Sequence, residues 1–124
     1  MCSQLNSVLL EGNLVKAPEL KKLESGKTVT TFPIANHRCY RNTKGELVED
    51  TTFMDVKCWD NLAERCAELL KKGSGVRLVG RIIQETWLDA NQKNHSKLIL
   101  SAEHVELMAG GRIDDIENEK EEEK

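Results

Sequence analysis

The sequence predicts an all-β domain with five strands and one helix. Most of the chain alternates β-branched or aromatic residues with polar ones, which is the two-residue period of a strand. Apolar residues take up the spacing of a helix in a single segment, which follows Trp59. Glycine, proline or clusters of polar residues separate these segments, as expected at turns.

A chain of 124 residues is long enough to bury a core without disulfides or metals, and we expect one folded domain at residues 1–108. Residues 109–124 form an acidic segment with seven acidic and three basic residues. This leaves 15 basic and 14 acidic residues in the domain, so binding that relies on charge alone is excluded but a local basic groove is not. The acidic segment has no aromatic residue, and we expect a disordered tail.

Neither a metal site nor a membrane span is expected. The cysteines are Cys2, Cys39, Cys58 and Cys66. None of them forms the C-x-x-C pairs of zinc sites and the three histidines are scattered, so we expect reduced thiols and no cofactor. No apolar run approaches the roughly 20 residues that cross a bilayer, and the N-terminus lacks the layout of a signal peptide. These features indicate a soluble cytoplasmic protein.

The first strand is expected at residues 6–15. Val8 and Leu10 share one side of it, and Gly12-Asn13 then interrupts the pattern. A glycine inside a strand is typical of the sharp bend that a small barrel needs at its corners.

The second strand is expected at residues 27–40, with Phe32 and Ile34 on the core side. Pro33 cannot donate a backbone hydrogen bond, so we expect this strand to lie at a sheet edge or to bulge there. Tyr40 lies near the end of the strand, before a polar, basic connection at 41–46 that leads back as a hairpin.

The third strand, at residues 51–59, shows the most unusual pattern of the chain. Met54, Val56 and Cys58 share one side, which is wholly apolar and is assigned to the core. The opposite side carries Phe53, Asp55, Lys57 and Trp59. Aromatic rings interleaved with charges suit single-stranded nucleic acid, but the same rings could instead pack under a second layer or a partner subunit.

A helix of about three turns is expected after Asp60, which is a good N-cap. Its apolar residues follow the i, i+4, i+7, i+8 spacing, and Lys71-Lys72-Gly73 is expected to end it. The last two strands are expected at residues 75–88 and 96–108. In the first of these, Trp87 shares its side with arginines rather than with the apolar residues.

The resulting order, β-β-β-α-β-β with a glycine bend in the first strand, is the plan of the five-stranded Greek-key barrel called the OB-fold. Four aromatic residues lie on polar sides or strand ends: Tyr40, Phe53, Trp59 and Trp87. Only Phe32 is left for the core, although an ordinary domain buries its rings. Exposed rings are suited to base stacking, which contributes roughly 1–3 kcal/mol per base and accepts any base.

Several segments resemble the bacterial and mitochondrial-type single-stranded DNA-binding (SSB) proteins. The matching motifs are Asn6-Ser7-Val8-Leu9-Leu10-Glu11-Gly12-Asn13-Leu14, Phe32-Pro33-Ile34-Ala35 with Tyr40, Thr52-Phe53 with Trp59, Leu62-Ala63-Glu64, Leu70-Lys71-Lys72-Gly73-Ser74, and Val79-Gly80 with Trp87. They follow in order over residues 5–108. The resemblance implies an OB-fold, homotetramers wrapped by single strands, and non-catalytic roles in DNA replication, recombination and repair. It also implies that the four exposed rings stack on bases.

We expect six basic residues, chosen by strand face and loop, beside the phosphates: Arg41, Lys44, Lys57, Lys72, Arg77 and Arg81. Two features depart from the family. Residues 83–86 include Ile83, Glu85 and Thr86 where relatives are often basic, so stacking is expected to outweigh charge. The chain ends in Glu121-Glu122-Glu123-Lys124 rather than the Pro-Phe tip of bacterial relatives, which makes recruitment of replication and repair proteins through the tail doubtful.

Two other functions fit parts of the pattern. Asp55-x-Lys57 resembles the acid-x-lysine element of metal-dependent nucleases, but that chemistry needs further acids at the same metal, and only Glu85 is a candidate. We therefore expect no enzymatic activity. An accessory OB module of the primosome, or one that binds protein or oligosaccharide, is the other alternative, although such a module does not need four exposed rings.

Overall fold

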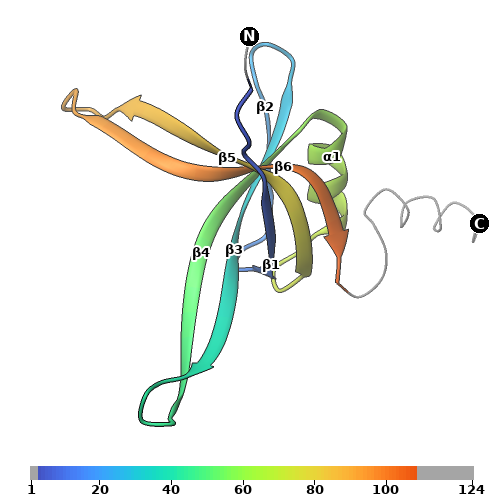
Figure 1. The fold of residues 1–124 in the computed structure, drawn as a ribbon. Coiled ribbons are helices and arrows are strands. Elements are labelled where there is room, and N and C mark those ends of the chain that lie inside the picture. The colour runs from blue at the N-terminus through green and yellow to red at the C-terminus, as the bar shows by residue number, and fades with distance from the viewer. Residues whose placement is uncertain (1–2, 109–124) are drawn as a thin grey trace, which may run out of the picture.

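The structure, a computed structural model, describes residues 3–108. It contains the elements β1 (Val8–Leu14), β2 (Glu19–Lys22), β3 (Thr28–Arg41), β4 (Leu47–Trp59), α1 (Asp60–Leu69), β5 (Gly75–Leu88) and β6 (Asn94–Leu107). The predicted fold class is confirmed: a closed barrel of five long strands with one helix between its third and fourth members (Figure 1). The tail predicted at 109–124 lies outside the described residues.

The strands form one sheet in the order β1-β5-β6-β4-β3-β2, and a further pairing of β1 with β3 closes the barrel. All neighbours are antiparallel except β4 and β6, which run parallel where Val56 faces Leu100. The closure depends on Gly12, because a Cβ there would come within 2.6 Å of the backbone oxygen of Ala35 on β3. The predicted glycine bend of the first strand therefore lies where β1 crosses from β5 to β3.

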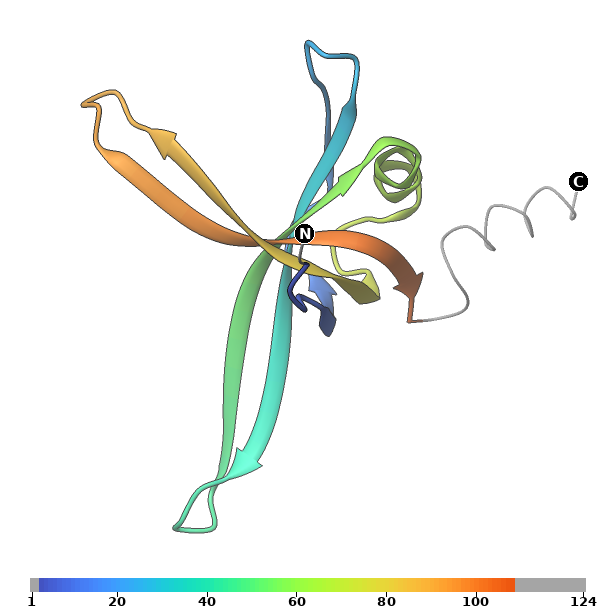
Figure 2. The ribbon, with the colours of Figure 1, turned by 45° about the horizontal axis from the view of Figure 1, so that its top comes forward.

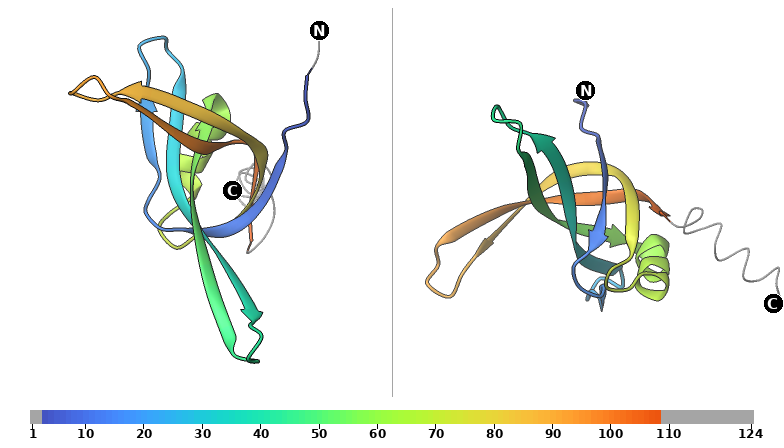
Figure 3. Two further views of the ribbon diagram at one scale, coloured as in Figure 1. Left: turned by 60° about the vertical axis from the view of Figure 1, so that its left-hand side comes forward. Right: turned by 90° about the horizontal axis from the view of Figure 1, so that it is seen from below.

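Two hairpins extend beyond the barrel as arms. β3 and β4 pair without interruption as far as Arg41 opposite Leu47, and β5 and β6 pair as far as Leu88 opposite Asn94. The arms diverge from the barrel in different directions, and α1 lies on the other side of the barrel from the β5–β6 arm (Figures 1 and 2). Both views in Figure 3 also show the two arms pointing in different directions. Long strands thus continue past the core and present side chains on both of their sides.

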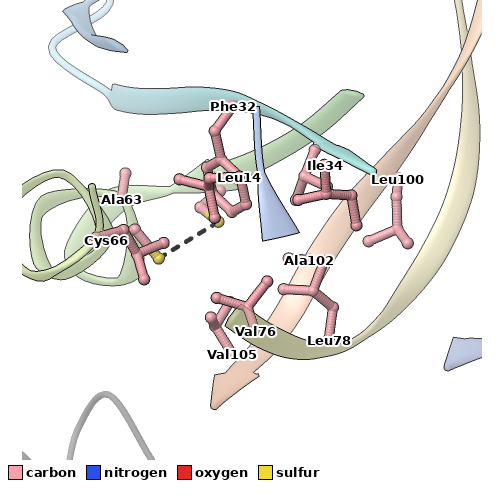
Figure 4. Packing of buried hydrophobic residues seen from close by; sticks show 13 residues of the cluster. Leu14, Phe32, Ile34, Ala63, Cys66, Val76, Leu78, Leu100, Ala102 and Val105 are labelled. Atoms are coloured by element: carbon pink, nitrogen blue, oxygen red, sulfur yellow. Dashed lines mark hydrogen bonds between the residues drawn. The ribbon is translucent and has the colours of Figure 1, made fainter. Parts of the chain in front are cut away.

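The core fills the barrel with aliphatic side chains and a single phenyl ring, that of Phe32 (Figure 4). Phe32 and Ile34 are fully buried, as predicted from the alternation in β3. The helix is attached to the barrel by Ala63 and Cys66 and by Thr30, whose buried hydroxyl donates a 2.6 Å hydrogen bond to the backbone oxygen of Ala63. α1, the one helix between residues 3 and 108, is too short and too polar to span a bilayer.

The cysteines between residues 3 and 108 are free thiols, as expected. Cys58 of β4 and Cys66 of α1 are fully buried, with 3.7 Å between their Sγ atoms. The hydrogen bond with Cys66 and the burial both raise the pKa of Cys58 well above that of an ordinary thiol. A buried thiol held in its neutral form is a packing residue rather than a reactive one.

Three local features differ from what the sequence led us to expect. Residues 19–22 form a sixth, short strand although all four are exposed, because backbone pairing with β3 holds them. Asp60 is the first residue of α1 and makes no capping hydrogen bond, and the helix ends at Leu69 before the lysines and Gly73. Pro33 lies in a strand paired on both sides. On the side away from β4, Pro33 falls between the part of β3 that pairs with β2 and the part that pairs with β1. The N–H that proline lacks would have no partner there, so no hydrogen bond is lost.

Candidate nucleic-acid interface

The outer side of β4 carries the residues that the sequence singled out. Val56 and Cys58 are fully buried, so Phe53 and Trp59, at odd positions, lie on the opposite side of the strand. Phe53 is 66% exposed, and Trp59 is half-buried next to the start of α1. Within residues 3–108 no second layer covers Phe53, which leaves its ring open to a flat ligand.

Trp87 lies on the β5–β6 arm and is 47% exposed. His95 faces it across the hairpin, and the two rings stack with centroids 5.6 Å apart and an angle of 17° between their planes. The His95 Nε2 lies 2.8 Å from a carboxylate oxygen of Asp89 in the turn. Asp89 in turn accepts hydrogen bonds from the backbone N–H groups of Asn91 and Lys93. The turn thereby holds one side of the indole against a fixed imidazole.

The pKa of Asp89 is lowered, first by the hydrogen bond with His95 and then by the one from the Lys93 backbone. Because the pKa is lowered in the folded protein, this carboxylate stabilises the turn at any pH above about 3.9, the ordinary pKa of an aspartate. That contribution is lost as the pH falls through the lowered pKa.

We expect the emission of Trp87, measured in a Trp59→Phe background, to change in that acidic pH range. The same titration of an added Asp89→Asn variant should lack the step, and an unaltered step would contradict the role of Asp89.

Trp87 belongs to the same outer surface as the rings of β4. In register, Trp87 faces His95 and Glu85 faces Lys97, while Lys57 of β4 faces Ser101 further along β6. Two ion pairs cross this surface: Lys57 with Glu85, and Lys97 with Asp55. We call the outer side of β4, β6 and β5 that carries Phe53, Trp59 and Trp87 the stacking face.

Tyr40 lies on the other side of the β3–β4 arm. Its partner in register is Val48, whereas Phe53 is paired with Ala35, and alternation puts these two pairs on opposite sides of the ribbon. The guanidinium of Arg38 lies 5.2 Å from the centre of the Tyr40 ring, which is a cation–π contact. The structure therefore brings three of the four predicted rings to one face and leaves Tyr40 on the reverse of an arm.

Four of the six predicted basic residues are exposed and have no acidic partner among residues 3–108. They are Arg41 and Lys44 at the tip of the β3–β4 arm, Lys72 in the turn after α1, and Arg81 on β5. Arg41 also donates a 2.9 Å hydrogen bond to the backbone oxygen of Gly45, which fixes it at the tip.

The other two predicted basic residues are already paired with acids. The Nζ of Lys57 lies 2.5 Å from a carboxylate oxygen of Glu85. Arg77 lies between Glu11 on β1 and Glu106 on β6, at 2.8 and 3.8 Å. Their positive charges are thus balanced within the fold.

The structure also adds residues that the sequence did not single out for this surface. His95 and Lys97 lie on the stacking face, and Arg38 covers Tyr40. For Arg38 the signal was its place two residues before the tyrosine, which puts both on one side of a strand. For His95 and Lys97 only the register of the β5–β6 hairpin could have revealed them.

The acids of the nuclease hypothesis do not converge. Asp55 and Glu85 each face a lysine, and no group of three His, Cys, Asp or Glu residues between positions 3 and 108 could hold a metal ion. This surface therefore combines exposed rings with two ion pairs and with Arg81, which faces Ser101 next to Lys57.

Residues 5–108 match the sequence profile described as the Single-strand binding protein family. The chain belongs to this family. The single-stranded DNA-binding protein of Aquifex aeolicus is 37% identical over 119 residues, which cover 96% of this chain and 80% of that protein. Those of Helicobacter pylori and Wolinella succinogenes are each 33% identical over 83% of this chain. The chain spans only 58% and 64% of their lengths.

Solved structures of SSB-family proteins have the same barrel. A deletion mutant of the single-stranded DNA binding protein from Thermus aquaticus has a TM-score of 0.76 at 24% identity, over 86% of this chain and 51% of that one. The Plasmodium falciparum SSB in complex with ssDNA has a TM-score of 0.74 at 24% identity, over 82% and 89% of the two chains. The fold predicted from the order of strands and helix is thus that of an SSB.

Proposed function

We propose that this protein binds single-stranded DNA without sequence preference and coats and protects it during replication, recombination and repair. The observation that carries the proposal is the stacking face, where three aromatic side chains from β4 and from the β5–β6 arm lie on one outer surface. Membership of the SSB family supports it, as do relatives whose names state that they bind single-stranded DNA. The protein acts by binding and has no catalytic role.

Bases stack on the rings of Phe53, Trp59 and Trp87, and a strand that passes around the β3–β4 arm reaches Tyr40. Each stack contributes roughly 1–3 kcal/mol and does not depend on which base is present. This accounts for binding without sequence preference, because nothing on the stacking face has to read the edges of the bases.

The phosphates contact the four exposed basic residues whose charges are not balanced by acids: Arg41, Lys44, Lys72 and Arg81. Two of them lie at the tip of one arm, one lies beside α1, and one lies on the barrel. A bound strand that touches all of them has to follow the surface of the barrel rather than a single groove.

Intrinsic tryptophan fluorescence tests the proposal directly. Addition of poly(dT) at low salt should strongly quench the emission of Trp59 and Trp87, because both indoles stack on bases. An equimolar amount of double-stranded DNA is the control and should have little effect. An emission spectrum that does not change with poly(dT) at low salt would reject the proposed function.

Salt separates the two kinds of contact. We expect Trp59→Ala to lose more affinity than Lys72→Ala at high salt, because stacking persists while a phosphate contact on single strands follows a log–log slope of about −0.7. Titrations of the two variants with poly(dT) at several salt concentrations measure both effects. If Lys72→Ala is the weaker binder at high salt, charge dominates and the assignment of Trp59 is wrong.

From the sequence alone we also propose a domain boundary after residue 108, where the acidic segment begins. We further propose a homotetramer in the cytoplasm, associated with the nucleoid, as the resemblance to the family implies. We also propose replication and repair proteins as partners, as the resemblance to the family implies. Light scattering combined with titrations of oligonucleotides of increasing length measures the number of subunits and the site size.

A further inference from the structure

Four charged side chains occupy the middle of the stacking face. They are Asp55 and Lys57 of β4, Glu85 of β5 and Lys97 of β6, and we call them the charged block. Lys57 pairs with Glu85 at 2.5 Å, and Lys97 pairs with Asp55. Glu85 and Lys97 also face each other in the register of the β5–β6 hairpin. Both lysines are therefore held by carboxylates, and the block has no net charge.

The rings flank this block. Phe53 precedes Asp55 by two residues, and Trp59 and Trp87 follow Lys57 and Glu85 by two. Residues two apart on one side of a strand are separated by roughly 6.6 Å. A base that stacks on any of the three rings thus brings its phosphate near the charged block.

The pair of Lys57 and Glu85 is the more sheltered of the two. The side chains are 24% and 33% exposed, so the carboxylate is partly withdrawn from water and acts on its surroundings more strongly than a fully solvated one. A phosphate that approaches Lys57 meets an oxyanion already in place on the ammonium group. It must displace Glu85 or share the lysine with it.

We infer that Glu85 determines the affinity for single-stranded DNA by competing with phosphate for Lys57, as Asp55 does for Lys97. This inference rests on the proposed function. The two carboxylates stand in for phosphates on the free protein, so Lys57 and Lys97 contribute little net neutralisation of the strand. Arg81 faces Ser101 next to Lys57 and is the neighbouring cation that has no acidic partner among residues 3–108. Lys57 is then a masked phosphate contact rather than a free one.

The substitution Glu85→Gln tests the inference, because it removes the competing charge while an amide oxygen remains for Lys57. We expect poly(dT) to bind about three- to fivefold more tightly at low salt. The log–log dependence on salt should become steeper by up to about 0.7, the slope of one added phosphate contact on a single strand. Fluorescence titrations of the full chain at four or more salt concentrations measure both quantities.

Glu68→Gln is the matched control. Glu68 is an exposed residue of α1, on the other side of the barrel from the β5–β6 arm, and its substitution changes the net charge by the same amount. It should leave affinity and slope close to those of the unaltered protein. If Glu85→Gln behaves like Glu68→Gln, the inference is wrong although the proposed function stands. If the unaltered protein does not bind poly(dT), the proposed function itself fails.

A double variant separates release of Lys57 from a general change of charge. Lys57→Gln/Glu85→Gln keeps the block neutral, and we expect its affinity and slope to match those of the unaltered protein. Retention of the tighter binding in the double variant would show that Lys57 is not the group that Glu85 masks, and would overturn the inference. Should Glu85→Gln unfold, Asp55→Asn frees Lys97 instead and must give the same tighter, more salt-dependent binding.

Discussion

Replacing Phe53 by alanine is expected to weaken the binding of poly(dT) by about 1–3 kcal/mol, or roughly 5- to 150-fold in Kd. The ring is 66% exposed and lies on the outer side of a strand whose inner side forms the core. Its removal therefore deletes a stacking surface without opening a cavity in the barrel. Kd from fluorescence titration, with Trp59 and Trp87 as reporters, measures the loss.

Two variants make this test specific. Phe53→Trp keeps a ring at the position and should retain binding. Leu20→Ala removes another exposed apolar side chain, 51% exposed on β2 and away from the stacking face, and should leave Kd unchanged. Thermal unfolding of all three variants should stay near that of the unaltered protein. Equal Kd values for Phe53→Ala and Leu20→Ala would show that Phe53 does not stack on bases.

The parts of this surface that follow a strand's own period were predictable from the sequence. Alternation alone assigned Val56 and Cys58 to the core and Phe53 to the outer side, and the structure agrees. The same reasoning assigned Phe32 to the core as its single phenyl ring. In each case neighbours along one strand decide the environment, so no knowledge of the partner strand is needed.

What depends on the register between strands was not predictable in this way. The contacts of Lys57 with Glu85 and of Trp87 with His95 join residues 28 and 8 positions apart, on different strands. The sequence therefore placed Lys57 beside a phosphate, although the fold pairs it with Glu85. The exposed strand β2 was missed for a related reason, since pairing with β3 defines it and its own side chains do not.

The position of Tyr40 is the clearest example of a feature that depends on the register between strands. By composition Tyr40 and Phe53 form a set of exposed rings, yet the register of β3 and β4 puts them on opposite sides of the arm. A strand of DNA that contacts both must pass around the edge or the tip of the β3–β4 hairpin. The register and the length of the arm therefore support the path around the arm that we propose for the strand.

Gly80 shows how a close approach between backbones constrains a position that looks like an ordinary core residue. It lies on the core side of β5 in the alternation with Val76 and Leu78, at the point where the register with β6 shifts. A Cβ at Gly80 would overlap the backbone oxygen of Ser101 and lie 2.9 Å from Leu100 Cδ2 and 3.0 Å from Ala102 Cα. The absence of a side chain is what allows β6 to pack against this bulge.

We therefore expect Gly80→Ala to destabilise the fold by at least about 3 kcal/mol, the upper end of the cost of overpacking, because backbone rather than a flexible side chain blocks the added methyl group. This is a large part of the 5–15 kcal/mol that typically stabilises a domain. Urea unfolding followed by circular dichroism measures it. Gly75→Ala on the same strand is the matched control: the atoms nearest to its Cβ would belong to side chains, that of Met108 at 3.2 Å and the Asn13 amide at 3.5 Å. We expect the control to cost less than about 1 kcal/mol, since side chains can move aside. Equal stabilities of the two variants would show that the strands separate easily at the bulge, and that Gly80 is not what fixes the approach of β6 to β5.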